Sequence, residues 1–410
     1  MNLSRKFAWR YFKARKSTNA INIIAWISIA AITIGTAALI LVLSVFNGFE
    51  GLVKSLYSSF YTDLKVFPGS GKVMTITPAQ LQQLRGLSGV RNFSLVVEEK
   101  ALLQNGEYQS VVYLKGVDGN YRYVTGVARS LVKGAFTLGT GDAPSLVLGA
   151  GIENAVGVQA DRNLLPLFVY LPRRSGEAQL DPMQSISMDT ITTSGTFVIQ
   201  QDFDNKYAIT NLDFMRRMLG LGPQEYSGLE IALGDPGQAD RMKPAVEKLF
   251  PPDRYKVQTR YEQNQGLYSV MGTEKWVIYA VLSLILVVAA FNIIGALTML
   301  VLEKEKDIAV LHALGGSRGF IQRIFLSEGL LLAIAGGLLG MVIALVISYL
   351  QIRYKLIPLA GGTFLIDYFP VKLKWSDFLL VGSTVLVIAL LASWLPARKA
   401  AAGQLSLRAE

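Results

Sequence analysis

The chain has 410 residues, of which 51% are hydrophobic and 17% are charged, and it contains no cysteine. A typical soluble domain carries about 25% charged residues. Part of this apolar sequence must therefore face something other than the core of a soluble domain. A soluble cytoplasmic enzyme, a disordered chain, a collagen-like fibre and a disulfide-stabilised scaffold are therefore disfavoured, and thiol catalysis is excluded.

The net charge of +10 is unevenly distributed along the chain. Residues 47–274 hold 22 basic and 23 acidic residues, which leaves 18 basic and 7 acidic residues for the remainder of the chain. A nucleic-acid-binding protein would carry its basic patch on a folded domain. Basic residues beside apolar segments are instead typical of membrane flanks, and we expect no nucleic-acid partner.

Four uncharged segments are long enough to cross a bilayer, which requires about 20 apolar residues. We place the spans at residues 21–46, 276–302, 329–350 and 378–395. The first apolar run exceeds the roughly 7–15 residues of a signal peptide and no small-x-small cleavage site follows it, so we interpret it as a retained span. The sequence thus predicts an α-helical membrane protein with four transmembrane helices in a 1+3 arrangement.

The orientation follows from the N-terminal tail, residues 1–20, which carries six basic and no acidic residues and should stay in the cytoplasm. The tail at 396–410 and the loop at 303–328 then lie on the same side. Residues 47–275 and the short loop at 351–377 lie outside, in the periplasm. The two short loops carry four basic residues each and do not decide the orientation.

Residues 47–275 mix alternating and helical patterns, as in a compact α+β domain. The Asn105-Gly106 pair between two alternating runs, 94–104 and 107–116, predicts a β-hairpin. We expect further strands at 63–67, 166–171, 195–200, 207–210 and 228–233, and helices at 77–87, 211–219 and 238–250, with Pro244 favouring a break or a late start in the last of these.

Two stretches at the ends of this domain, residues 47–60 and 260–275, contain no proline and lead into the spans. We expect both to be helical stalks that transmit motion between membrane and domain. Within the domain, the polar stretch 172–194 lacks periodicity. It is interpreted either as an ordinary surface loop or, because such long loops are uncommon, as a loop with a function.

The sequence lacks the combinations of residues that typically form an active site. His312 is the single histidine, which excludes a serine–histidine triad in the outer domain and any multi-histidine metal site. No phosphate-binding glycine loop is present, and Gly139-Thr140-Gly141 is interpreted as a turn. Acidic pairs such as Glu98-Glu99 and Asp202 with Asp204 are interpreted as solvated. We therefore expect no enzyme activity and no cofactor in this chain.

Polar and small residues within the spans point to helix packing. Asn292 lies deep in the second span, where an amide needs a partner or marks a functional site. Gly336 with Gly340, and Ala31 with Gly35, form small-x-x-x-small faces. Because no ionisable group lies inside the spans, an ion-coupled transporter is disfavoured and the energy source is expected elsewhere.

The cytoplasmic loop after the second span contains a short amphipathic pattern. Ile308, Leu311 and Leu314 recur every third residue behind a charged stretch, and Gly315-Gly316 can end the helix. Such a helix lies on lipid or docks into the groove of a partner.

Several motifs resemble one family, the lipoprotein-releasing ABC-transporter permeases of the LolC/LolE type. The resemblance covers the whole chain, including the 1+3 arrangement, although the family usually has Met where Phe46 stands. The last motif is shared with the broader MacB/FtsX-like permeases. The motifs are Leu43-Ser44-Val45-Phe46-Asn47-Gly48-Phe49-Glu50, Ala290-Phe291-Asn292-Ile293-Ile294, Glu303-Lys304, Asp307-Ile308-Ala309-Val310-Leu311 and Leu395-Pro396-Ala397-Arg398-Lys399-Ala400-Ala401.

The resemblance implies partners and a place of action. Such permeases work as pairs of the same or related chains in the inner membrane of Gram-negative-type bacteria. They associate with a dimeric cytoplasmic ABC ATPase that binds ATP and Mg. They extract lipid-anchored proteins from the outer leaflet and pass them to a periplasmic chaperone. Removing an acyl anchor costs about 0.8 kcal/mol per buried CH₂, which requires an energy source rather than a passive channel.

The resemblance also implies three groups of site residues. The groups are the ATPase contacts Glu303, Lys304, Asp307, Leu311 and Gly315; the lipoprotein cavity or gate residues Ser44, Asn47 and Asn292; and a chaperone-docking loop at 173–194 with Arg173, Arg174, Gln179 and Met183.

Two alternatives remain open at this point. One is another MacB/FtsX-like permease that exports a different substrate or regulates cell-wall hydrolases. The other is a membrane-anchored periplasmic sensor that works without an ATPase.

Overall fold

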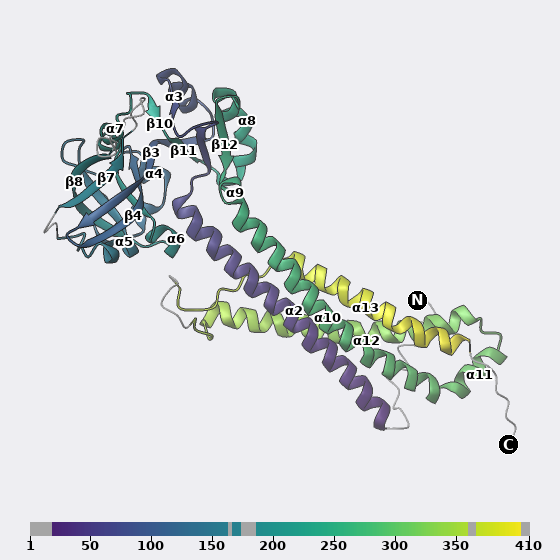
Figure 1. Cartoon of the computed structure of the whole chain (residues 1–410). Helices are drawn as coiled ribbons and strands as arrows, with labels where there is room; N and C mark the ends of the chain where they lie inside the picture. The colour runs from purple at the N-terminus through teal and green to yellow at the C-terminus, as the bar shows by residue number, and fades with distance from the viewer. Residues whose placement is uncertain (1–18, 163–165, 174–185, 360–365, 403–410) are drawn as a thin grey trace. The chain divides into compact units, whose positions relative to one another are not determined.

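The computed structural model describes residues 19–162, 166–173, 186–359 and 366–402 (Figure 1). The chain divides into two compact units. The first unit comprises residues 1–52, 269–360 and 366–410, and the second comprises residues 53–268 and 361–365.

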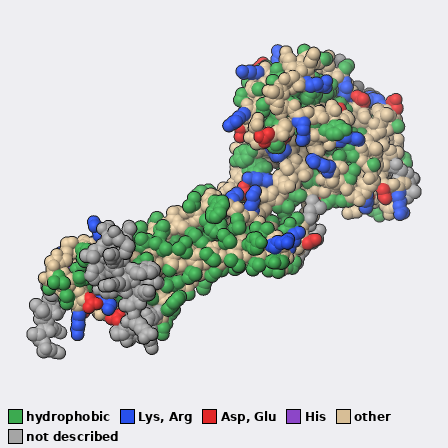
Figure 2. All heavy atoms as spheres, turned by 180° about the vertical axis from the view of Figure 1, so that it is seen from behind, with side chains coloured by type: hydrophobic (Ala, Val, Ile, Leu, Met, Phe, Trp, Pro, Cys, Tyr) green, Lys and Arg blue, Asp and Glu red, His purple; other side chains and the backbone are tan. Residues whose placement is uncertain are grey.

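Long apolar helices build the first unit, and in the described ranges four helices are long and apolar enough to cross a membrane. Hydrophobic side chains dominate the surface of these helices in Figure 2, as expected where lipid rather than water is the neighbour. The helices of this unit are α2 (Asn19–Phe60), α10 (Gln265–Glu303), α11 (Glu305–Ala313), α12 (Arg318–Tyr354) and α13 (Trp375–Ala401).

The two predicted stalks differ from each other. Helix α2 continues through residues 47–60 without interruption, so the first stretch is helical as expected. The second stretch is divided into α9 (Arg260–Gln263) and the start of α10 at Gln265. Thr259 caps α9 in a capping box with Glu262, and Asn264 then leaves the helical region with φ −128°. The expectation of one continuous helix over 260–275 was therefore wrong.

Glycines on α12 allow α2 to approach closely. A Cβ added at Gly336 would lie 2.9 Å from the carbonyl oxygen of Ile29, and one at Gly340 would lie 2.6 Å from that of Thr33. The hydroxyl of Thr33 donates to the carbonyl of Gly336 at 3.1 Å. The predicted small-x-x-x-small face of the third span therefore packs backbone against backbone, as is usual in membrane helices.

The second unit is built on a ten-stranded sheet of order β12-β1-β11-β3-β4-β9-β6-β8-β5, with β7 pairing β3 and β8. Most pairs are antiparallel, but β4–β9 and β6–β8 are parallel. The strands are β1 (Leu64–Pro68), β3 (Val90–Asn105), β4 (Tyr108–Val117), β5 (Leu131–Gly134), β6 (Ser145–Gly149), β7 (Leu167–Pro172), β8 (Ile186–Phe197), β9 (Tyr207–Asn211), β11 (Gly228–Leu233) and β12 (Tyr255–Thr259), and a separate pair joins β2 (Met74–Thr75) to β10 (Glu225–Tyr226).

Short helices cover this sheet, and two hydrophobic clusters fill the space. The larger cluster includes Leu103, Leu148 and Phe214, and the smaller one includes Phe60 and Phe197. The helices are α3 (Pro78–Arg85), α4 (Tyr121–Val124), α5 (Ala150–Ala155), α6 (Gln201–Asp204), α7 (Leu212–Leu219) and α8 (Ala239–Leu249), with 3₁₀ turns η1 (Val127–Arg129) and η3 (Pro236–Gln238).

Local signals in the sequence identify several of these elements correctly. Gly106 takes φ +57° in the turn between β3 and β4, which confirms the hairpin. Thr77 and Asn211 cap α3 and α7 by accepting backbone hydrogen bonds. Gly139 takes φ +67° next to a bridge with Pro144, which confirms the turn there.

Two expectations about this unit were wrong. Residues 186–194 of the predicted loop belong to β8, because this threonine-rich segment pairs with both β7 and β6. Pro244 lies inside α8 rather than at a break. The bond that its missing N–H would form is to the carbonyl of Asp240, in the exposed first turn, where water can replace it.

Candidate functional site

A buried polar cluster joins three helices of the first unit. Asp377 in the first turn of α13 accepts a short hydrogen bond from the side-chain amide of Asn47 on α2. Lys275 on α10 lies 3.3 Å from the other oxygen of Asp377 and 3.0 Å from the amide oxygen of Asn47. The side chain of Asp377 is 5% exposed and that of Lys275 is 26% exposed. We call Asn47, Lys275 and Asp377 the three-helix cluster.

The segment before α13 completes this cluster. Lys374 lies 3.1 Å from Glu50 on α2, and the backbone N–H of Lys372 donates to the carbonyl of Ser44 at 2.9 Å. A Cβ added at Gly48 would lie 2.1 Å from the carbonyl oxygen of Pro370, so only glycine allows this approach. The position of Asp377 near a helix N-terminus also favours its negative charge. The cluster therefore links α2 at Asn47 and α10 at Lys275 to the first turn of α13.

The three residues predicted for the cavity have different environments. Ser44 and Asn47 are both 1% exposed, which places them inside the unit. Asn292 is exposed on α10, close to Phe291, which is 65% exposed. The backbone carbonyl of Asn292 accepts a bond from the hydroxyl of Ser28 at 3.0 Å. An exposed amide on an apolar helix favours contact with another helix or a ligand.

The predicted coupling segment forms α11, and Lys304 and Asp307 form an ion pair of 3.3 Å within it. The three-residue spacing suggested that its apolar residues lie on one face of the helix. In the structure they do not. Ile308 is buried against the helices of the same unit, Leu311 is half-buried, and Leu314 is 79% exposed. This is because the α-helix repeats every 3.6 residues, so a spacing of three drifts around the helix.

The end of α11 is determined by two glycines. Gly315 takes φ +87°, and the N–H of Gly316 donates to the carbonyl of Leu311 at 2.8 Å. This confirms that the glycine pair ends the helix. The end leaves Val310 and Leu314 exposed, one turn apart and next to Asp307. The roles predicted for Glu303, Lys304, Asp307, Leu311 and Gly315 stay predictions.

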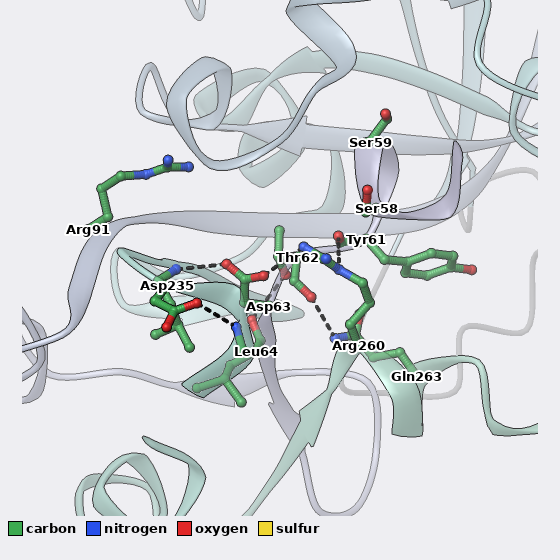
Figure 3. A network of polar contacts seen from close by, with 12 residues as sticks. Ser58, Ser59, Tyr61, Thr62, Asp63, Leu64, Arg91, Asp235, Arg260 and Gln263 are labelled. Atoms are coloured by element: carbon green, nitrogen blue, oxygen red, sulfur yellow. Dashed lines mark hydrogen bonds and ion pairs between the residues drawn. The ribbon is translucent and has the colours of Figure 1, made fainter. Parts of the chain in front are cut away.

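A second polar network lies in the second unit, where the chain leaves α2 and later enters α9 (Figure 3). Asp63 accepts bonds from the guanidinium of Arg260 at 2.7 Å and from the backbone N–H of Leu233 at 2.8 Å. The Nε of Arg260 donates to the carbonyl of Tyr61 at 3.1 Å. The backbone N–H of Arg260 donates to the backbone carbonyl of Asp63. We call Asp63 with Arg260 the neck pair.

A buried ion pair also lies within the sheet. Lys115 is 2.7 Å from Glu230, and their side chains are 2% and 4% exposed. The ammonium of Lys115 lies over the rings of Phe60 and Tyr121. Burial raises the pKa of Tyr121 well above its usual value, so it remains a neutral phenol beside this pair. Among the described residues, no group of three His, Cys, Asp or Glu side chains could hold a metal ion.

The predicted docking loop is only partly described. Arg173 follows β7 and is exposed, while Arg174, Gln179 and Met183 lie outside the described residues. Sequence reasoning missed the three-helix cluster and the neck pair. A signal for the first was available, because Lys275 and Asp377 each stand directly before a predicted span.

Comparisons with known proteins match both parts of the chain. Residues 262–405 match the family described as FtsX-like permease C-terminal, and residues 25–164 match the MacB-like periplasmic core domain. The periplasmic region of MacB from Actinobacillus actinomycetemcomitans, a solved structure, has 13% identity and a TM-score of 0.36, and the match covers 52% of this chain and 94% of that one.

Relatives cover nearly the whole chain. Lipoprotein-releasing system transmembrane protein LolE of Haemophilus influenzae is 27% identical, over 98% of this chain and 97% of its own length. LolC of Neisseria meningitidis serogroup B is 26% identical, over 97% of each chain. LolC of Xylella fastidiosa is 25% identical, over 97% of this chain and 96% of its own length. These matches confirm the resemblance that the motifs indicated.

Proposed function

We propose that this chain, a homologue of LolE and LolC with FtsX-like and MacB-like regions, is the permease subunit of an ABC transporter that releases lipoproteins from the inner membrane. The observation that carries this proposal is the extent of the relationship, which covers the membrane helices and the large domain together. A sensor that shared only the outer domain would not account for matches over 97–98% of the chain.

In this proposal the four long helices cross the membrane in a 1+3 arrangement, with both termini in the cytoplasm. Residues 47–275 form the periplasmic domain, and the basic residues of the N-terminal tail set the orientation. The working unit contains a second permease subunit, the same chain or a related one. The lipoprotein passes from the outer leaflet to a periplasmic carrier.

The energy comes from a separate cytoplasmic ATPase dimer that binds ATP and Mg, and this chain needs no cofactor of its own. The exposed face of α11 is the proposed contact, because Val310 and Leu314 lie one turn apart beside Asp307. An exposed apolar pair with a flanking charge is what a helix needs to dock into a partner's groove. Movement of α11 then reaches the long helices through buried Ile308.

Contact with substrate or with the second subunit is proposed for the exposed face of α10 around Asn292. We expected Ser44 and Asn47 to line the lipoprotein cavity or gate, and this proposal gives them a different role. Their burial supports a role in holding the helices together rather than in touching the acyl chains. Docking of a carrier on the loop after Arg173 remains a part of the proposal that rests on the resemblance.

Copurification tests the proposal. The chain is purified in mild detergent from its native membrane, and associated proteins are identified. We expect an ABC ATPase, and we expect Asp307→Lys with Leu314→Lys to lower its recovery about tenfold, because both substitutions place a charge into a docked surface. Asp253→Lys, an equally simple charge reversal at an exposed site of the second unit, is the matched control. Unchanged recovery in the α11 variant would remove α11 as the contact.

The match of residues 25–164 to the MacB-like periplasmic core domain also favours a second candidate function, export of another substrate by a permease of that broader type. The same purification separates the two. An acylated protein in the complex supports lipoprotein release, whereas an outer-membrane export partner or a cell-wall hydrolase supports the alternative. Absence of any ATPase would contradict both.

A further inference from the structure

A hollow of about 450 Å³ on the second unit is lined by three arginines. It lies between the start of β3 and the segment that contains α4 and η1. The residues around it are Arg91, Asn92, Arg122, Tyr123, Thr125 and Arg129, and no carboxylate is among them. We call this site the arginine hollow.

Backbone carbonyls hold two of the three guanidinium groups in place. The Nη2 atom of Arg91 donates to the carbonyl of Tyr123 at 3.3 Å, and that of Arg122 donates to the carbonyl of Phe136 at 3.1 Å. Each contact uses one N–H of a group that has five, so the remaining donors are available to a ligand. The two side chains are therefore positioned without being neutralised.

The backbone around the hollow is firmly anchored. Tyr121 and Val127, on either side of the turn, are fully buried. The N–H of Gly126 donates to the carbonyl of Ser59 at 2.8 Å, and the hydroxyl of Thr125 donates to the carbonyl of Tyr121. Residues on a fixed backbone lose little conformational freedom when they bind a ligand. The backbone of the hollow is therefore fixed in advance, while the three arginine side chains that it carries are exposed and accessible to a ligand.

The charge of the hollow contrasts with that of its surroundings. Residues 47–274 together carry a net charge of −1, with 22 basic and 23 acidic residues. Several other basic residues of this unit are paired, such as Arg260 with Asp63 and Lys133 with Glu153. Within the part of the chain that the structure describes, none of the three arginines of the hollow forms an ion pair. Three like charges that share one hollow repel each other until an anion joins them.

We propose that the arginine hollow binds a phosphate group. Guanidinium groups form bidentate hydrogen bonds to phosphate, and several such groups can bind one phosphate because it presents more acceptor oxygens than a carboxylate does. The amide of Asn92 supplies a neutral donor beside them. The phosphate comes either from the head group of an anionic phospholipid or from a free phosphate, and the two sources share this chemistry.

The test uses the full chain in dodecyl maltoside, a detergent without phosphate, and measures binding by calorimetry. Two probes are compared, inorganic phosphate and glycerophosphoglycerol, the soluble head group of phosphatidylglycerol. We expect saturable binding of at least one probe, weakened about tenfold or more in Arg122→Gln/Arg129→Gln. Arg241→Gln, at an exposed position of α8 outside the hollow, is the matched control and should bind as the unaltered chain does.

The outcomes separate the sources and can overturn the proposal. Binding of glycerophosphoglycerol alone assigns the site to a lipid head group, and binding of inorganic phosphate with equal strength assigns it to phosphate in general. Equal binding of both probes by the double variant and the unaltered chain would overturn the site. Tighter binding of a tetraglutamate peptide than of either probe would also overturn it in favour of carboxylates. Thermal unfolding of each variant checks that the fold is intact.

Discussion

Replacing Asp377 with alanine is expected to destabilise the helical unit by about 2–3 kcal/mol. The substitution removes the carboxylate that accepts from the buried amide of Asn47, and it leaves the ammonium of Lys275 with only the amide oxygen of Asn47. Breaking a buried ion pair by removing one partner usually costs roughly 3–5 kcal/mol, and the partial exposure of Lys275 reduces this value. The midpoint of thermal unfolding of the full chain in detergent measures the loss of stability.

A neighbouring ion pair supplies the control for this prediction. Lys374 and Glu50 belong to the same region, but their side chains are 35% and 19% exposed. Lys374→Ala should therefore cost only about 0.5–1 kcal/mol, as is usual for a partly solvated pair. Asp377→Asn should lie between the two, because an amide oxygen can still accept from Asn47. Equal midpoints for Asp377→Ala and Lys374→Ala would show that the three-helix cluster does not hold the helices together.

Asp63→Ala is expected to have a comparably large effect on the second unit, about 3 kcal/mol. Asp63 is 6% exposed and accepts from both Arg260 and the backbone of Leu233. Its loss leaves the buried N–H of Leu233 without an acceptor and the guanidinium of Arg260 with only the carbonyl of Tyr61. The most direct readout is hydrogen exchange. The amide of Leu233 should exchange about a hundredfold faster or more, because its acceptor is gone and local opening is easier.

The control for the neck pair is Arg254→Ala, which removes an ion pair with Asp253 whose side chains are 80% and 70% exposed. It should leave exchange at Leu233 unchanged. A double variant of Asp63 and Arg260 should cost less than the sum of the single changes, because each single change leaves a partner unsatisfied. Additive costs would mean that the two side chains do not interact energetically.

The local part of this architecture could be predicted from the sequence, because its causes are local. The length of the uncharged apolar runs identified the four helices that can cross a membrane. Capping side chains at Thr77 and Asn211, and the turn at Gly106, determined elements within a few residues of themselves. The part of strand β8 at 186–194 was missed because its partners, β6 and β7, decide its conformation. Strand pairing depends on neighbours that no short window contains.

The candidate sites could be predicted much less well. Asn47 and Asp377 are 330 residues apart, and Lys275 and Asp377 are 102 apart. In the sequence each of the charged residues resembles an ordinary flank of a span, and only the packing of three helices makes them a cluster. Asn47 was noticed as a motif residue, but its burial and its partners could not be foreseen. The neck pair, 197 residues apart, was missed for the same reason.

ATP-dependent release of an acylated protein from proteoliposomes tests the central proposal most directly. The chain is reconstituted with its copurified ATPase and second permease subunit, a lipoprotein and a soluble acceptor for it. We predict that the lipoprotein leaves the liposomes only with ATP and Mg, and that its retention without ATP reflects the cost of about 0.8 kcal/mol per CH₂ of anchor. Equal release without ATP, or none with it from a complex that hydrolyses ATP, would contradict the proposed function.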